Sequence, residues 1–229
     1  MKRSEINKEM KNAVEFLEEH NFYLPKFAYW SLLDWKIEGK EIDEIIKNKL
    51  GWDITDYGSG NFSKNGLIHF TIRNGNPKDV LTGGKQYCEK IMIIKEGQMT
   101  YLHHHESKIE DIINRGGGIL LIELYNVNQE EGLDDSDVKI SINGERNRLK
   151  AGSIIELKPG ESITLFPNHY HRFWAKEGHG KVLIGEVSSV NDDYIDNTFL
   201  KPTKRFTEIE EDEDPLYLLS DDYEKMLNT

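Results

Sequence analysis

The sequence contains almost no cysteine, and this absence restricts the chemistry open to it. Cys88 is the only cysteine among 229 residues, so no disulfide can form within the chain. A zinc site built on several thiolates is excluded for the same reason. Any metal site would therefore have to use histidine and carboxylate ligands.

Long apolar runs and an excess of positive charge are also missing. No run of about 18 apolar residues is present, so no transmembrane helix is predicted. The opening MKRSEINKEMKNAVEF has neither an apolar core nor a small-residue cleavage site, and we expect a mature cytoplasmic protein. The 41 acidic residues exceed the 29 basic ones, which gives a formal net charge of -12. This balance argues against nucleic acid and anionic membranes as partners, because both require a basic surface.

Much of the negative charge lies near the C-terminus. TEIEEDEDP (207–215) and SDDYE (220–224) form an acidic segment, which we expect to be an ordinary solvated tail. The chain is long enough for one well-buried core. We predict a single domain over residues 1–229, with a helical arm at 1–50, a β-barrel at 52–205 and the acidic segment at 206–229.

Two helices are predicted in the first fifty residues. The first has Ser4 as its expected N-cap and an apolar face made by Ile6, Met10, Ala13, Val14 and Leu17. The second is expected over DWKIEGKEIDEIIKNKLG (34–51), with Gly51 as its C-terminal stop.

From about residue 52 the pattern changes to short β-rich runs at spacings of roughly ten residues. The clearest are LIHFTIR, EKIMIIK, ILLIELYNV, VKISI, SIIEL, SITLF and KVLIGEVSSV. Asn143-Gly144 fits a two-residue hairpin turn, and Pro159-Gly160 marks another turn. The runs indicate an all-β fold, an antiparallel sandwich or barrel.

Histidines are concentrated in two short segments of this β-rich region. If residues 99–105 form a strand, side chains alternate, so His103 and His105 share one face and His104 takes the other. Glu110 follows five residues later, and a bend would return it to the same site. A second segment, PNHYHRFW (167–174), offers His169 and His171 in phase with each other. Nitrogen and carboxylate ligands together predict a site for a divalent ion such as Mn, Fe, Co, Ni or Zn. The alternative is that these are surface or core histidines without a metal.

The spacing of these residues resembles the first motif of the cupin superfamily, which runs here from Gly97 through His103, His105 and Glu110 to Gly117. The second cupin motif is met in part by Gly160, Pro167 and His171, with Ala175 where the usual asparagine stands. The resemblance implies a jelly-roll double-stranded β-helix. It favours His171 as the fourth ligand and keeps His169 in reserve.

Longer strings narrow the resemblance to the D-lyxose isomerase family of sugar isomerases. They are LGWDITDYGSGNF, EKIMI, EDIINRGGG, PGESITLFP, YHRFW, IGEVSSVNDDYIDN and RFTEIEEDE. The family binds a divalent ion, usually manganese, through residues that correspond to His103, His105, Glu110 and His171. It implies interconversion of D-lyxose with D-xylulose, and of D-mannose with D-fructose.

Such an isomerase needs groups that move protons, and several residues are candidates. Lys108 lies between two ligands and is a candidate proton handler, unless it is a solvent-facing lysine. Arg205 and the carboxylates Glu210 and Glu211 lie in a string that could fold across the open end of the barrel, and we choose Glu211 as the base. The alternative for these three is charged surface.

Asp192, Asp193 and Glu186 are candidates for holding sugar hydroxyls, because carboxylates accept hydrogen bonds from neighbouring hydroxyls. The alternative is an Asx-rich turn after the preceding strand. Arg115 to Gly118 lacks the ending of a phosphate loop and is interpreted as a tight turn after the metal-binding strand. A free sugar is therefore favoured over a phosphorylated one.

Two other functions keep the same site. A cupin dioxygenase would use oxygen at a similar metal centre, and a non-enzymatic cupin would bind a sugar without turnover. A homodimer is predicted for all of these functions, from the apolar helix faces and the edge strands.

Overall fold

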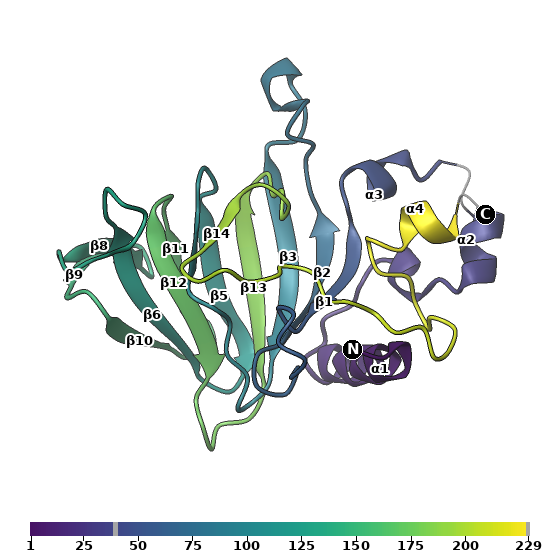
Figure 1. Ribbon diagram of the computed structural model, residues 1–229, viewed down its shortest axis with the longest axis horizontal. Coiled ribbons are helices and arrows are strands. Elements are labelled where there is room, and N and C mark those ends of the chain that lie inside the picture. The colour runs from purple at the N-terminus through teal and green to yellow at the C-terminus, as the bar shows by residue number, and fades with distance from the viewer. Residues whose placement is uncertain (39–40, 228–229) are drawn as a thin grey trace.

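The computed structural model describes residues 1–38 and 41–227, and most of them form two curled antiparallel sheets that face each other (Figure 1). The larger sheet has the order β1-β2-β3-β13-β5-β11-β8-β9, and the smaller one has the order β10-β6-β12-β4-β14, with β7 paired to β6. This confirms the predicted all-β jelly roll with an N-terminal helical arm.

The strands of the larger sheet are β1 (Gly51–Thr55), β2 (Leu67–Arg73), β3 (Tyr87–Ile94), β13 (Val182–Ser189), β5 (Glu110–Gly117), β11 (Ser162–Leu165), β8 (Val138–Ile142) and β9 (Glu145–Leu149). Those of the smaller sheet are β10 (Ser153–Leu157), β6 (Leu120–Val127), β12 (His169–Ala175), β4 (His103–His105), β14 (Asn197–Phe199) and β7 (Leu133–Asp134). The helices are α1 (Arg3–Glu19), α2 (Leu32–Glu38), α3 (Asp43–Lys47) and α4 (Tyr223–Met226), with short 3-10 turns η1 (Lys26–Tyr29) and η2 (Val80–Thr82).

Both predicted turns are present. Asn143 and Gly144 have φ of 51° and 83°, the two positive values that a type I′ hairpin needs, and they join β8 to β9. Pro159-Gly160 carries the chain from β10 in the smaller sheet to β11 in the larger one. The segment from Arg115 to Gly117 is not the expected tight turn, because β5 continues through Gly117.

Two apolar cores lie on opposite faces of the larger sheet. Strand side chains alternate, so neighbouring residues on β13 enter different cores: Ile184 lies between the two sheets and Leu183 lies under α1. Because both faces of β13 are covered, its first half, VLIG at 182–185, is a continuous apolar run in sequence.

The helical arm covers the outer face of β1, β2 and β3 (Figure 1). Ile6, Met10 and Leu17 of α1 pack there with Trp52 and Phe70. The helix begins at Arg3, with Lys2 as its N-cap, and Ser4 is therefore not the cap that we predicted. Ser4 instead bonds Asp212 through its backbone N–H and its hydroxyl, at 2.9 and 2.7 Å.

The single helix predicted over 34–51 is wrong. The described residues there form two short helices, α2 and α3, and residues 39 and 40 lie outside the described part of the chain. Gly51 does not end a helix but opens β1 at a φ of 115°, where a Cβ would lie 2.2 Å from Tyr223 Oη. Burial of Trp35 against Leu218 and Tyr223, far along the chain, holds α2 in place.

The acidic C-terminal segment is not a solvated tail. Arg3 N–H donates to the carbonyl of Glu210 at 2.8 Å, and the fully buried Arg3 guanidinium binds Glu211 and Asp222 at 2.7 and 2.9 Å. The Asn7 side chain donates to Glu213 at 2.6 Å. The negative charge of this segment therefore meets the N-terminus of α1, where it is favourable. No helix in the described residues is both long and apolar enough to span a bilayer.

Candidate metal centre

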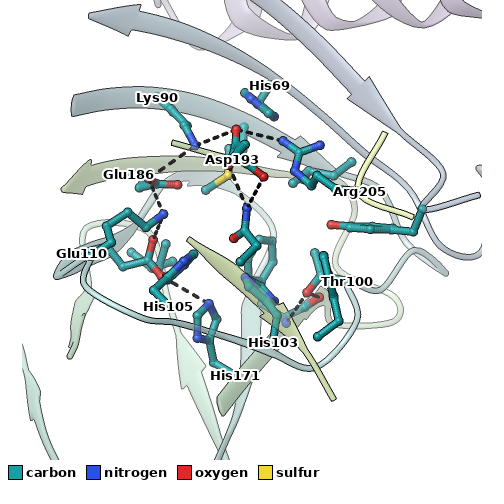
Figure 2. Close-up of a pocket in the computed structure, with 18 residues that line it drawn as sticks. His69, Lys90, Thr100, His103, His105, Glu110, His171, Glu186, Asp193 and Arg205 are labelled. Carbon is teal, nitrogen blue, oxygen red and sulfur yellow. Dashed lines mark hydrogen bonds and ion pairs between the residues drawn. The ribbon is translucent and has the colours of Figure 1, made fainter. Parts of the chain in front are cut away.

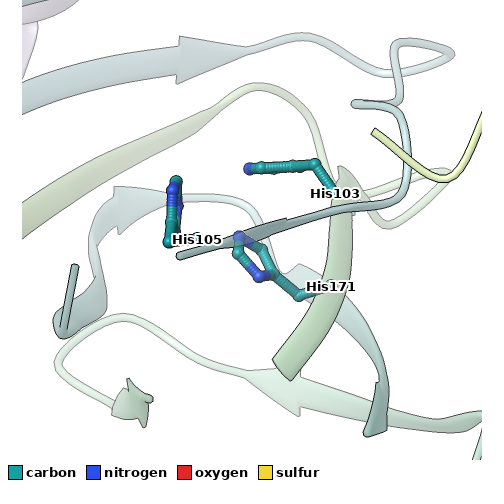
Figure 3. Close-up of side chains that lie close together, drawn as sticks. All are labelled: His103, His105 and His171. Carbon is teal, nitrogen blue, oxygen red and sulfur yellow. The ribbon is translucent and has the colours of Figure 1, made fainter. Parts of the chain in front are cut away.

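Three histidines converge from the smaller sheet into the space between the sheets (Figure 3). His103 and His105 belong to β4, and His171 on β12 is the register partner of His103. Ring centroids lie 4.3 Å apart for His103 and His171 and 5.5 Å apart for His105 and His171. One nitrogen from each ring lies within 4.8 Å of the other two, so the three rings could hold one ion.

Glu110 reaches the same point from the facing sheet. It is the first residue of β5, and its Oε1 lies 3.2 Å from His105 Nε2 and 3.2 Å from His171 Nε2. Two ligands at a right angle around an ion, each about 2.1 Å from it, lie about 3 Å apart. The spacing of these atoms is therefore that of ligands around a common centre.

The other ring nitrogens face oxygen atoms of the protein. Nδ1 of His103 lies 2.9 Å from the carbonyl of Tyr101, and Nδ1 of His171 lies 3.1 Å from that of His169. Nδ1 of His105 lies 3.3 Å from Asp196 Oδ2. Metal-binding histidines use their second nitrogen in this way, which fixes the ring and the tautomer. The residues therefore fit a divalent cation.

The surroundings of the cluster keep two of its groups, His103 and Glu110, in the forms that ligands require. Burial, followed by the neighbouring His171 and His105, lowers the pKa of His103 well below its ordinary value, so its ring is neutral. Burial alone would raise the pKa of Glu110, but Lys108 and His105 outweigh it and lower the pKa well below its ordinary value. Glu110 Oε1 is buried and has no hydrogen bond within the described residues, as expected of an acceptor that a cation satisfies.

The other two histidines of the predicted segments, His104 and His169, lie outside the cluster. His104 is on the opposite face of β4, as alternation predicts, but it does not point to solvent: it is 2% exposed and its ring packs against Tyr170 at 4.7 Å. The reserve candidate His169 accepts the backbone N–H of Phe166 at 3.3 Å and is not part of the cluster.

Lys108 is buried beside the cluster and is not a solvent-facing lysine. Its Nζ lies 2.8 Å from Glu110 Oε2 and 3.0 Å from Glu186 Oε1. Burial by itself would lower the pKa of Lys108. The two carboxylates raise it by a larger amount, so the pKa of Lys108 lies above its ordinary value. The ammonium group therefore joins the candidate ligand Glu110 to a second buried carboxylate.

Alternating charges continue from Glu186 away from the histidines (Figure 2). Lys90 lies between Glu186 Oε1, at 3.7 Å, and Asp193 Oδ2, at 3.5 Å. Arg205 Nη2 then joins Asp193 to Asp53, at 3.0 and 2.7 Å. Every one of these side chains is largely buried, so the interactions are poorly screened by water.

All of these groups except Asp53 line a small cavity of about 50 Å³. The structure brings most of the predicted site residues to its wall: His103, His105, Glu110, His171, Lys108, Glu186, Asp193 and Arg205. A cavity of this size, with a candidate metal centre at one end, suits a small polar ligand.

Three predicted site residues are not at the cavity. Glu211 binds Arg3 on the helical arm, and its side chain is 49% exposed, so we no longer assign it as the base. Glu210 is exposed beside Lys2. The Asp192 carboxylate accepts a hydrogen bond from the backbone N–H of Tyr194 at 3.0 Å. This is the Asx-turn role that we gave as the alternative to sugar binding.

Sequence reasoning missed Asp53, His69 and Lys90. Each is a polar residue on a largely apolar strand, on β1, β2 and β3 respectively; His69 and Lys90 are buried and Asp53 is half-buried. Such an interruption is the signal that could have identified them, since a buried charge needs a partner.

Solved structures of other proteins share this architecture. An L-ribose isomerase mutant of Acinetobacter sp. DL28, in complex with L-ribose, matches with a TM-score of 0.62 and 14% identity over 92% of this chain and 98% of that one. The L-ribose isomerase of Cellulomonas parahominis with L-ribose matches with a TM-score of 0.60 and 13% identity, over 92% and 98%. At such identities the likeness defines the fold: a cupin barrel, here with a candidate metal centre inside it.

Sequence comparison is more specific. The profile of the D-lyxose isomerase family matches residues 1–223. A D-lyxose/D-mannose isomerase of Escherichia coli O157:H7 is 46% identical over 224 residues, covering 97% of this chain and 98% of that protein. Another from Serratia proteamaculans is 45% identical over 228 residues, with the same coverage. The chain belongs to the D-lyxose isomerase family and is a sugar isomerase.

Proposed function

We propose that the protein is a metal-dependent aldose–ketose isomerase that interconverts free D-lyxose with D-xylulose and D-mannose with D-fructose. The observation that carries the proposal is the cluster itself, in which three histidines and Glu110 present ligand atoms to one point of a small cavity. The relatives named for D-lyxose and D-mannose support the choice of sugars.

His103, His105, Glu110 and His171 would hold the ion, for which we propose Mn²⁺. A divalent ion bound there would act as a Lewis acid toward the oxygens at C1 and C2 of the sugar. The ligands come from both sheets, so the barrel itself fixes the position of C1 and C2 relative to the surrounding carboxylates.

Glu186 is the best-placed base in the cavity. Its contacts with Lys108, Lys90 and Ser188 all use Oε1, which leaves Oε2 for a substrate. Burial would raise the pKa of Glu186, but Lys108 and Lys90 outweigh it and lower the pKa, so the carboxylate is ionised at neutral pH. We propose that Glu186 takes the proton from C2 and returns it to C1, while Lys108 assists transfer of the hydroxyl proton from O2 to O1.

An anaerobic panel of pentoses and hexoses, assayed for ketose with Mn²⁺ added, tests the proposed activity. We expect D-lyxose and D-mannose to be converted. Oxygen consumption without isomerisation would instead indicate a dioxygenase, and sugar binding without turnover would indicate a non-enzymatic cupin.

Isomerisation in D2O tests the role of Glu186. Proton transfer through a side chain predicts deuterium at C1 of the ketose, and Glu186→Gln should lower kcat by about 100-fold or more. Complete retention of the C2 hydrogen would indicate a hydride shift, and Glu186 would then not be the base.

Two further expectations complete the proposal. We propose that the enzyme works in the cytoplasm. The homodimer stays a prediction, and light scattering of the purified protein can test it.

A further inference from the structure

The cavity has a polar wall at the end opposite the metal centre. His69 Nε2 lies 3.5 Å from Asp53 Oδ2, and Arg205 bridges Asp53 and Asp193. Figure 2 shows His105 and His171 at one end of the cavity and His69, Asp193 and Arg205 at the other. Asp53, His69 and Asp193 lie close enough together to suggest a second cation site. Arg205 and Lys90 already balance the two carboxylates, so we do not interpret the group in that way.

Sheet register joins the wall to the metal centre. Asp53 pairs with His69 across β1 and β2, Lys90 pairs with Glu186 across β3 and β13, and Glu110 opens β5. The inner face of five adjacent strands therefore carries polar side chains from the metal centre to the wall.

A second, larger cavity of about 470 Å³ begins on the other side of the wall. His69 and Asp193 line both cavities, so the wall is one side chain thick at these residues. Thr71, two residues after His69 on the same face of β2, lines only the outer cavity, whereas Met92, the register partner of His69, lines only the inner one.

Two buried atoms of the wall have no hydrogen-bond partner among residues 1–38 and 41–227. They are Nδ1 of His69 and Nη1 of Arg205. His69 is 4% exposed, and a buried polar atom left without a partner costs free energy. Hydroxyl groups of a ligand in the inner cavity could satisfy such atoms, since a hydroxyl both donates and accepts.

We propose that His69, with the Asp53–Arg205–Asp193 bridge, forms the subsite for the far end of the sugar chain and determines the choice between pentose and hexose. The proposal rests on the proposed function. A pentose ends at this wall, and the additional carbon of a hexose has to pass His69 toward the outer cavity.

D-lyxose and D-mannose are suited to test this. They have the same configuration at C2, C3 and C4, and D-mannose carries one more hydroxymethyl carbon at the far end. A change between variants in the ratio of their kcat/KM values therefore reports on the chain-end subsite and not on the metal centre. A pocket that is shaped around one carbon discriminates by about tenfold or more.

The experiment measures kcat/KM for both sugars in each variant. His69→Ala opens the wall, and we expect the D-mannose to D-lyxose ratio to rise about tenfold. Thr71→Leu narrows the outer cavity behind the wall, and we expect the ratio to fall about tenfold because Thr71 lines only that cavity. Thr71→Ser, which adds no volume at the same position, is the matched control and should leave the ratio unchanged.

A variant that loses activity toward both sugars would be damaged in its fold. The ratio measured for the other variant would then decide the test. Ratios within twofold of wild type for both His69→Ala and Thr71→Leu would overturn the proposal. Wild-type protein that converts neither sugar would overturn the proposed function instead, so the two failures are distinguishable.

Discussion

His103, His105 and His171 share one arrangement: each turns Nδ1 toward a protein oxygen and Nε2 toward the cavity. His104 has the same chemistry but lies on the other face of β4, against Tyr170. The difference between a candidate ligand and a packing residue is therefore one position along a strand. Side-chain alternation was enough to predict it, although not the burial of His104.

Substitution of these residues should separate the two roles. His105→Ala and Glu110→Ala each remove a candidate ligand, so we expect both variants to lose bound metal on dialysis. His104→Ala should keep its metal and lose only stability, because it vacates a buried position. Elemental analysis of the dialysed proteins measures this. Metal loss in His104→Ala alone would reverse the assignment of the two faces.

At the scale of secondary-structure elements, the strands could be predicted from the sequence, whereas the helical arm could be predicted only in part. Apolar alternation and the Asn143-Gly144 turn are local signals. They were sufficient to predict β2, β8 and the hairpin that joins β8 to β9. The break between α2 and α3 and the docking of the acidic segment depend on partners far along the chain, such as Asp222 with Arg3. The same limit explains why Glu211 was chosen and Lys90 missed: only the register between strands determines which charges meet.

The contact of Arg3 with the acidic segment predicts a large effect on stability. Arg3→Met removes one partner of a buried ion pair and leaves Asp222, which is 2% exposed, without a countercharge. We expect the free energy of unfolding to fall by about 3–5 kcal/mol. Urea unfolding measures the change.

Lys47→Ala provides the control for Arg3→Met. It breaks an ion pair with Asp43 whose two side chains are 66% and 83% exposed, and should leave the free energy of unfolding almost unchanged. Equal effects of the two substitutions would show that the acidic segment is not bound to α1 in solution.

At the scale of the whole molecule, the buried charges should make stability depend on pH. Burial lowers the pKa of His69 from 6.5 to about 4. The positive charges of Lys90 and Arg205 also lower this pKa, whereas the negative charge of Asp53 opposes the shift. Asp193 also faces the ring. The unfolded chain therefore takes up a proton at a higher pH than the folded one, and stability falls as pH decreases from about 6.5 toward about 4.

The contribution of His69 to this loss is about 3 kcal/mol. Urea unfolding in excess chelator, at several values between about pH 7 and about pH 4.5, should show a smaller loss for His69→Gln than for wild type. An identical pH dependence in the two proteins would mean that His69 is not buried as a neutral ring.

The account as a whole depends on a divalent ion held by the three histidines and Glu110. The most direct measurement is the rate of D-lyxose conversion to D-xylulose by protein stripped with chelator, before and after addition of Mn²⁺. We predict that the stripped protein is inactive and that Mn²⁺ restores the activity, but not in His105→Ala or Glu110→Ala. Full activity in protein shown by elemental analysis to be free of metal would contradict the account.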